Sequence, residues 1–349
     1  MNQPKRQSNI EILRIIAISM IIIFHYTLHG GWQFDTGTTD QIIVKIFLVL
    51  GELGVNLFML ITGYFMIERK RKCTHILQII LESVFYTALT SIILYKNNLY
   101  DFKTPDAWLK IIFPELYNIY WYVTVYILIY ILSPYINKML HTLDKKQMRE
   151  FLATVLCIWC VVPSIFQNLF GTTETGFYYS RFIWLIIVYC IGAYIKMYGP
   201  EKINTLKKNM IFAAIVFGMM LVLIIVSQKN PHLFAGIVDQ KFWAPNTILM
   251  ILLSIALFNC FCFVSVKFIP LVNTVAGTTL GVYMFHAGLL YRFIWEKIEA
   301  HIHIRGGGLT SILIGSLLVL LTAVIIDLLR KILFEIITKL IKKIICKEN

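Results

Sequence analysis

The sequence is poor in charged side chains, and acidic ones are the scarcer kind. Charged residues make up 15% of the 349 positions, with 19 aspartates and glutamates against 32 lysines and arginines, whereas 58% of the positions are hydrophobic. Apolar runs recur from one end to the other, and no region has the composition of a soluble domain. These properties exclude a soluble globular protein and predict a single all-α integral membrane domain over residues 1–349.

The sequence also lacks the patterns of several other classes of site. The seven cysteines lie mostly within apolar runs, so we expect small buried side chains and neither a disulfide framework nor a metal site. The net charge of +13 comes from short basic clusters between apolar segments, so nucleic acid binding is not expected. No small-residue cleavage site follows the first apolar run, which we therefore expect to be retained as a helix.

Apolar runs of about twenty residues predict about ten membrane-spanning helices. The runs begin near residues 10, 42, 74, 119, 148, 178, 209, 244, 271 and 308. With both termini in the cytoplasm, 21 of the 32 lysines and arginines fall in inside segments, so the positive-inside rule predicts this orientation. Residues 330–349 are then a basic cytoplasmic tail that lies along the anionic inner leaflet of the plasma membrane. The external stretch 96–118 is long enough to hold a short surface helix.

Two ionisable residues in the first apolar run are the strongest indication of a functional site. Arg14 and His25 are eleven residues apart, which places them on one helix face and roughly 16 Å apart along the axis. Ionisable groups inside a membrane segment are costly unless they face a partner, a cavity or a ligand. A ligand long enough to reach both would place its phosphates at the arginine and a proton-donating group at the histidine. An acyl-CoA that enters from the cytoplasm fits this description.

Further candidates for substrate binding are polar or aromatic residues in later runs: Glu52, Asn56, Glu82, Trp121, Tyr283 and His286. Four of them have a structural alternative. The two glutamates can be hydrogen-bonding partners within a helix bundle, Trp121 can belong to an interfacial aromatic belt, and His286 can be a satisfied interior residue. The predicted depths place His25 and His286 at one level in the outer half of the bilayer.

Several motifs together resemble a known family. Arg14 followed by His25, then GVNLFMLITGYF, YWYVTVYILIYILSP, YCIGAYI and TLGVYMFH, look like the successive signatures of the membrane acyltransferase 3 family. The resemblance implies ten membrane helices, an acyl-CoA donor and O-acylation of a carbohydrate, often a surface or exported polysaccharide. The run YWYVTVYILIYILSPYIN is similar to the bacterial exopolysaccharide and cell-wall subgroup.

The same resemblance implies roles for individual residues. Arg14 and His25 match the paired essential residues of the first helix, and His286 matches the histidine of a late motif. Asn56 stands where many members have aspartate. Our leading hypothesis is therefore a membrane O-acyltransferase that uses acetyl-CoA as a donor substrate, with His25 as general base, Arg14 as phosphate ligand, no bound cofactor and no metal. A carbohydrate acceptor and the lipid bilayer are the other expected partners.

The alternative hypothesis is a proton-coupled transporter of a sugar or glycolipid. Arg14, His25, Glu52 and Glu82 would then form a proton relay. The sequence lacks the two related halves with matching broken helices that many transporters show, which favours the acyltransferase.

Overall fold

The computed structural model describes residues 7–30, 38–165, 180–199, 205–229, 244–302 and 308–345. Within these ranges every regular element is helical, which confirms the predicted all-α class. The elements are α1 (Ser8–His29), α2 (Thr39–Met66), α3 (Cys73–Lys96), α4 (Pro105–Ile112), α5 (Trp121–Thr142), α6 (Lys145–Leu156) with a π-helical segment (Cys157–Val161), α7 (Arg181–Tyr198), α8 (Leu206–Lys229), α10 (Ile248–Phe263), α11 (Pro270–Ala276), α12 (Thr279–Ala287), α13 (Tyr291–Ile302) and α14 (Gly308–Ile345).

Seven of the described helices are long and apolar enough to cross a membrane: α1, α2, α3, α5, α7, α8 and α14. They coincide with seven of the ten predicted segments and identify the chain as a multi-pass membrane protein. The segments predicted from residues 148, 244 and 271 contain no single α-helix of that length among the described residues, although residues 145–165 form a continuous helical run of α and π turns. The first contains the charged start of α6, and the second contains α10, which has 16 residues.

The segment from residue 271 is divided because the chain turns within it. α11 ends at Ala276, Gly277 and Thr278 form a turn, and α12 ends at Ala287 before Gly288. Glycine lowers helix stability by about 1 kcal/mol relative to alanine, so both glycines favour these breaks. The prediction of one unbroken helix here is wrong.

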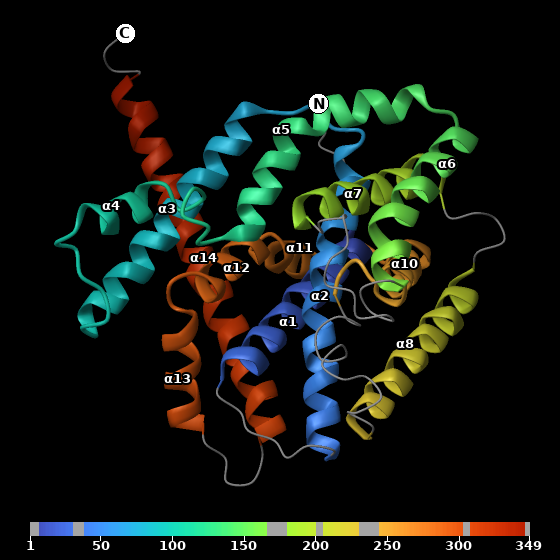
Figure 1. Cartoon of the computed structure of the whole chain (residues 1–349). Coiled ribbons are helices and arrows are strands. Elements are labelled where there is room, and N and C mark those ends of the chain that lie inside the picture. The colour runs from blue at the N-terminus through green and yellow to red at the C-terminus, as the bar shows by residue number, and fades with distance from the viewer. Residues whose placement is uncertain are drawn as a thin grey trace.

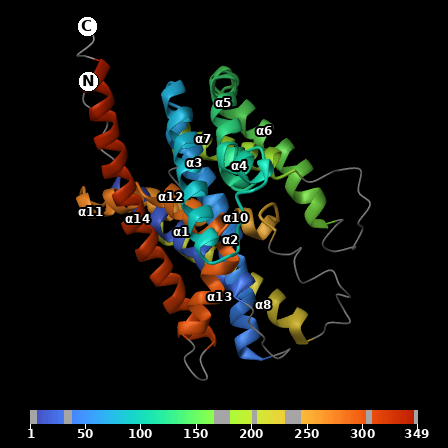
Figure 2. The ribbon, with the colours of Figure 1, turned by 90° about the vertical axis from the view of Figure 1, so that its left-hand side faces the viewer.

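α2 occupies the centre of the bundle and packs along both α1 and α7 (Figure 1). Two glycines permit the contact with α7. A Cβ atom at Gly63 would collide with the carbonyl oxygen of Tyr189, and one at Gly192 would collide with that of Leu60. Small residues let membrane helices approach closely in this way. α1 also contacts α12 and α14, and Figure 2 shows α14 and α8 at opposite margins of the bundle.

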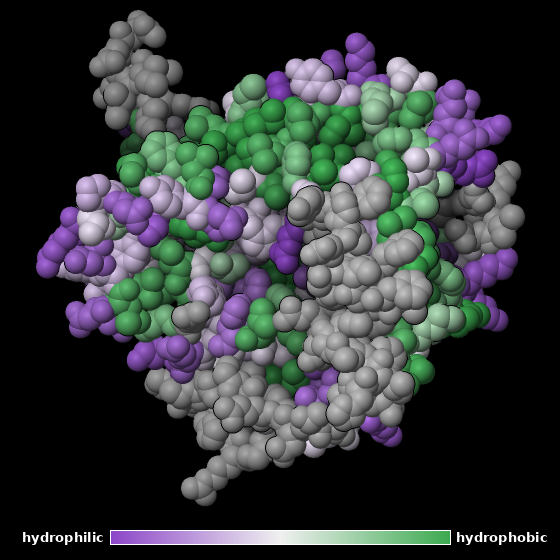
Figure 3. Space-filling view, viewed as in Figure 1, coloured by the Kyte–Doolittle hydropathy of each residue, from purple (hydrophilic) through white to green (hydrophobic). Residues whose placement is uncertain are grey.

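The marginal helices expose apolar side chains, as expected of surfaces in contact with lipid. Exposed examples on α5, α8 and α14 include Leu128, Ile131, Met139, Met210, Ile215, Val222, Leu317, Leu321 and Ile325. Figure 3 shows a broad apolar area on the face that carries α5, with hydrophilic side chains toward its edges.

Two predicted regions lie outside the membrane spans: the stretch 96–118 and the tail 330–349. The stretch 96–118 contains α4, which confirms a short helix there; its N-cap Thr104 accepts a hydrogen bond from the backbone N–H of Ala107. The predicted tail 330–349 begins as an uninterrupted part of α14, and residues 346–349 lie outside the described ranges. The cytoplasmic location of both termini stays a prediction.

Candidate functional site

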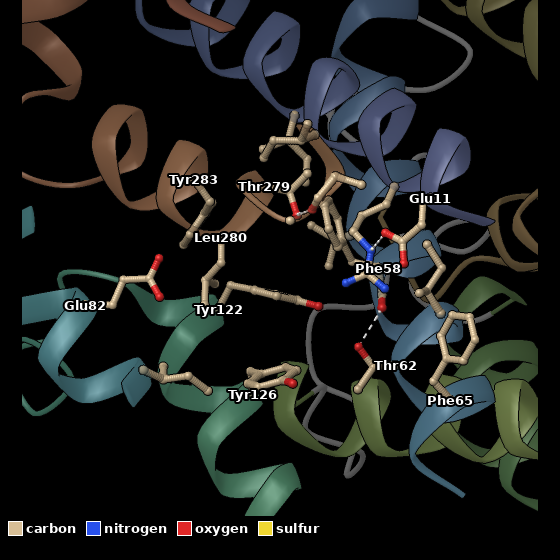
Figure 4. A pocket seen from close by; sticks show the side chains of 18 of the residues that line it. Glu11, Phe58, Thr62, Phe65, Glu82, Tyr122, Tyr126, Thr279, Leu280 and Tyr283 are labelled. Carbon is tan, nitrogen blue, oxygen red and sulfur yellow. Dashed lines mark hydrogen bonds and ion pairs between the residues drawn. The ribbon is translucent and has the colours of Figure 1, made fainter. Parts of the chain in front are cut away.

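A cavity of about 710 Å³ runs beside α1, where its lining extends from Gln7 to His29. Side chains from α2, α3, α5, α7, α11, α12 and α14 complete the lining. Its volume is in the range of small-molecule sites in proteins. The cavity contains six of the predicted site residues: Arg14, His25, Glu52, Glu82, Trp121 and Tyr283. Figure 4 shows Tyr122 and Tyr126 projecting from α5 between Glu82 on α3 and Glu11 on α1.

Arg14 lies in the half of the cavity that contains the start of α1. Its Nε atom is 3.3 Å from Oε2 of Glu11, one helical turn earlier, and 29% of its side chain is exposed. The regular helix holds both side chains on the face that lines the cavity. Five more cationic side chains line the cavity: Arg69, Arg181, Lys196, Arg330 and Lys331. Because guanidinium and ammonium groups bind phosphate, these residues suit an anionic ligand.

His25 and His286 meet toward the C-terminal end of α1, away from Arg14. Their ring centroids are 5.1 Å apart, which confirms that the two histidines share a level. Nδ1 of His286 lies 2.6 Å from the carbonyl oxygen of Val282, so this nitrogen carries a proton and donates it to the carbonyl. His25 lines the cavity, whereas His286 is fully buried and does not belong to the lining. His29 also approaches His25, with ring centroids 6.1 Å apart.

Glu52 and Trp121 are joined by a residue that the sequence interpretation left out. Arg181, the first residue of α7, has its Nη2 atom 3.8 Å from Oε1 of Glu52, and its guanidinium lies 4.7 Å from the centre of the Trp121 ring. All three side chains line the cavity. A Cβ atom at Gly51 would meet the ring of Phe24, so this group lies beside the His25 end of α1.

Asn56 is placed apart from the other candidates. Its Nδ2 atom donates to the carbonyl oxygen of Pro245 and to Oγ of Ser254, and its Oδ1 atom accepts from the indole N–H of Trp184. The side chain is fully buried and does not line the cavity. In this position Asn56 connects α2 with α7 and α10, which is a packing role.

Glu82 belongs to a buried ionic network on α14. Its Oε1 atom lies 2.9 Å from Nη2 of Arg330, whose Nε atom donates to Oδ1 of Asp327 at 2.7 Å. Asp327 also accepts from the Tyr86 hydroxyl and pairs with Lys331 at 3.1 Å. The sequence interpretation missed Asp327, although a lone aspartate in an apolar run, followed by cations three and four residues later, is a readable signal.

Tyr283 lies close to the α5 aromatics. Its ring centroid is 5.9 Å from that of Tyr122, and the Phe58 ring lies 6.2 Å from Tyr122 on the other side. All three side chains line the cavity. Among the described residues, no group of three or more histidine, cysteine or carboxylate side chains is arranged to hold a metal ion.

Comparison with known proteins identifies the kind of chain that carries this cavity. A family model described as an acyltransferase domain, that of the acyltransferase 3 family, matches residues 7–329. No curated protein and no solved structure shows a significant match. The matched range includes α1 through the first part of α14 and therefore every candidate residue predicted from the sequence, whereas Arg330 and Lys331 follow it directly.

Proposed function

The chain belongs to the acyltransferase 3 family of membrane acyltransferases, and from this premise we propose that it transfers an acetyl group from acetyl-CoA to a hydroxyl of a cell-surface or exported polysaccharide. The protein acts in the plasma membrane. The observation that carries the proposal is the single cavity lined by both Arg14 and His25, roughly 16 Å apart along α1.

The donor lies along this cavity with its anionic and reactive ends apart. Phosphate groups pair with Arg14 and the neighbouring cations, and the thioester reaches toward His25. The family match supports an acyl donor, and the separation of the two residues supports one with a long arm between its phosphates and its acyl group. Acetyl-CoA is a substrate here and leaves as CoA.

The transfer requires one proton acceptor. A nitrogen of His25 takes the hydroxyl proton as the acceptor oxygen attacks the thioester carbonyl carbon. The C–O ester bond forms, the C–S bond breaks, and the CoA thiolate leaves. The proton then passes from the His25 imidazolium to that thiolate, which gives free CoA and a neutral His25. An imidazole suits both steps because its ordinary pKa lies close to neutral pH.

The acceptor sugar enters beside Glu52, Arg181 and Trp121. Aromatic faces pack against the apolar face of a sugar ring, and charged side chains bond its hydroxyls. This group lies at the His25 end of α1, so a sugar bound there places a hydroxyl near the base. Tyr283 is the further candidate contact.

The test uses cells that carry the normal protein, no protein, the His25→Ala variant or the His141→Ala variant at matched membrane levels. His141 is an exposed histidine near the end of α5 and does not line the cavity. NMR of surface glycans before and after mild alkali measures ester-linked acetyl groups. We expect equal ester levels with the normal protein and His141→Ala, and a loss of at least about 10²-fold with His25→Ala. If cells without the protein kept the normal ester content per glycan but carried less surface glycan, the proposal would be refuted and a transporter favoured.

A further inference from the structure

We propose that His286 is a positioning residue that fixes the tautomer and orientation of His25 and does not contact either substrate. The inference rests on the proposed acyl transfer and assigns a division of labour within the histidine pair. His25 faces the cavity, whereas His286 lies behind it.

The hydrogen bonding of His286 determines what its second nitrogen can do. Because Nδ1 donates to the carbonyl of Val282, the neutral ring presents Nε2 as an acceptor. This Nε2 atom is buried and has no hydrogen-bond partner among the described residues. A buried acceptor without a partner is destabilising, so it indicates an interaction that forms in the working protein.

His25 supplies the complementary group. Its Nδ1 atom is also buried without a hydrogen-bond partner in the described part of the chain. An imidazole nitrogen lies about 1.2 Å from the ring centre, so rings with centroids 5.1 Å apart place two nitrogens about 2.7 Å apart when both point along the line between the centroids. A hydrogen bond from Nδ1–H of His25 to Nε2 of His286 therefore satisfies both atoms. It leaves Nε2 of His25 unprotonated and directed to the cavity, as a general base requires.

The surroundings of the two rings indicate that an imidazole, and not a carboxylate, orients His25. The ring contacts of His25 within the described ranges are with Phe24, His29 and His286, and His286 also contacts Tyr283 and Trp295. In the described part of the chain neither ring forms a hydrogen bond or ion pair with a carboxylate. In many hydrolases a buried aspartate orients the catalytic histidine and stabilises its imidazolium. A neutral imidazole performs both tasks without placing a second formal charge inside the membrane, where a charge is costly.

The experiment compares two substitutions of equal length, His286→Gln and His286→Met. Glutamine offers an acceptor oxygen near the position of Nε2, whereas methionine fills similar space without a strong acceptor. Membranes that contain each variant receive labelled acetyl-CoA and the host's own surface glycan, stripped of esters by mild alkali. Alkali-labile label in the glycan is measured as an initial rate against acetyl-CoA concentration, per amount of folded protein. We expect the kcat of His286→Gln to stay within about tenfold of normal, and that of His286→Met to fall about 10²-fold, with KM for acetyl-CoA changed less than about threefold.

A double-mutant comparison separates positioning from damage to the fold. If His286 acts through His25, His286→Met has no further effect on the residual rate of a His25→Ala protein. Equal rates for His286→Gln and His286→Met, or losses that multiply in the double variant, would overturn the inference. Failure of the proposed function is recognised by a different result: membranes with the normal protein would then transfer no alkali-labile label to the glycan.

Discussion

Asp327→Asn tests how far the cavity wall depends on its buried ionic network. The substitution keeps the side-chain shape and an acceptor oxygen for the Tyr86 hydroxyl, but it removes the negative charge that Arg330 and Lys331 share. Asp327 has no exposed surface, and only 7% of the Arg330 side chain is exposed. Removing one partner of such a buried pair typically costs about 3–5 kcal/mol, because the remaining charge stays buried. Glu82 still pairs with Arg330, so we expect the lower end of that range.

The loss is measured by unfolding the purified protein in mixed detergent micelles and following tryptophan fluorescence. Glu335→Gln is the matched control, because it breaks an ion pair with Lys339 on the same helix where both side chains are largely exposed. Exposed pairs contribute little, so this variant should unfold like the normal protein. If Asp327→Asn unfolded at the same detergent composition as Glu335→Gln, the network would not hold α14 against α3, and the reasoning from burial would be refuted.

Three further variants test packing and ligand contacts. Gly63→Ala should prevent stable folding, because its Cβ would collide with the backbone of α7. Gly218→Ala is the control, because open space surrounds that position, and it should leave the yield of folded protein unchanged. Size-exclusion chromatography measures both yields. Asn56→Leu should lower the free energy of unfolding by about 1–3 kcal/mol, because buried hydrogen bonds are lost. The rate of acyl transfer per amount of folded protein should stay normal. A loss of kcat without a loss of stability would contradict the packing role of Asn56. Arg14→Gln should raise KM for acetyl-CoA, and an unchanged KM would remove Arg14 from the donor site.

The shared face of Arg14 and His25 on the first helix was predictable because it depends on the geometry of one helix alone. Regular α geometry places Arg14 and His25 on the same face whatever surrounds them, and the structure places both in the lining of one cavity. The shared level of His25 and His286 followed from residue counts along two segments. That estimate tolerated the break at Gly277 because the chain resumes a helical path from Thr279.

Contacts between distant segments were beyond the sequence. Nothing in the apolar run around Asn56 indicates that its amide meets Trp184 and Pro245, which are more than a hundred residues away. Likewise, Arg330 reads as the start of a basic tail, yet packing against α3 buries it beside Glu82. Sequence periodicity assigns a face to each helix, but it does not say which other helix that face meets.

The most direct test of the central claim uses purified protein in detergent, labelled acetyl-CoA and the alkali-treated host glycan. We predict alkali-labile label on the glycan, release of an equal amount of CoA, and loss of both with His25→Ala but not with His141→Ala. Absence of label from protein that is folded and still moves the glycan across reconstituted vesicles would contradict the claim and establish transport instead.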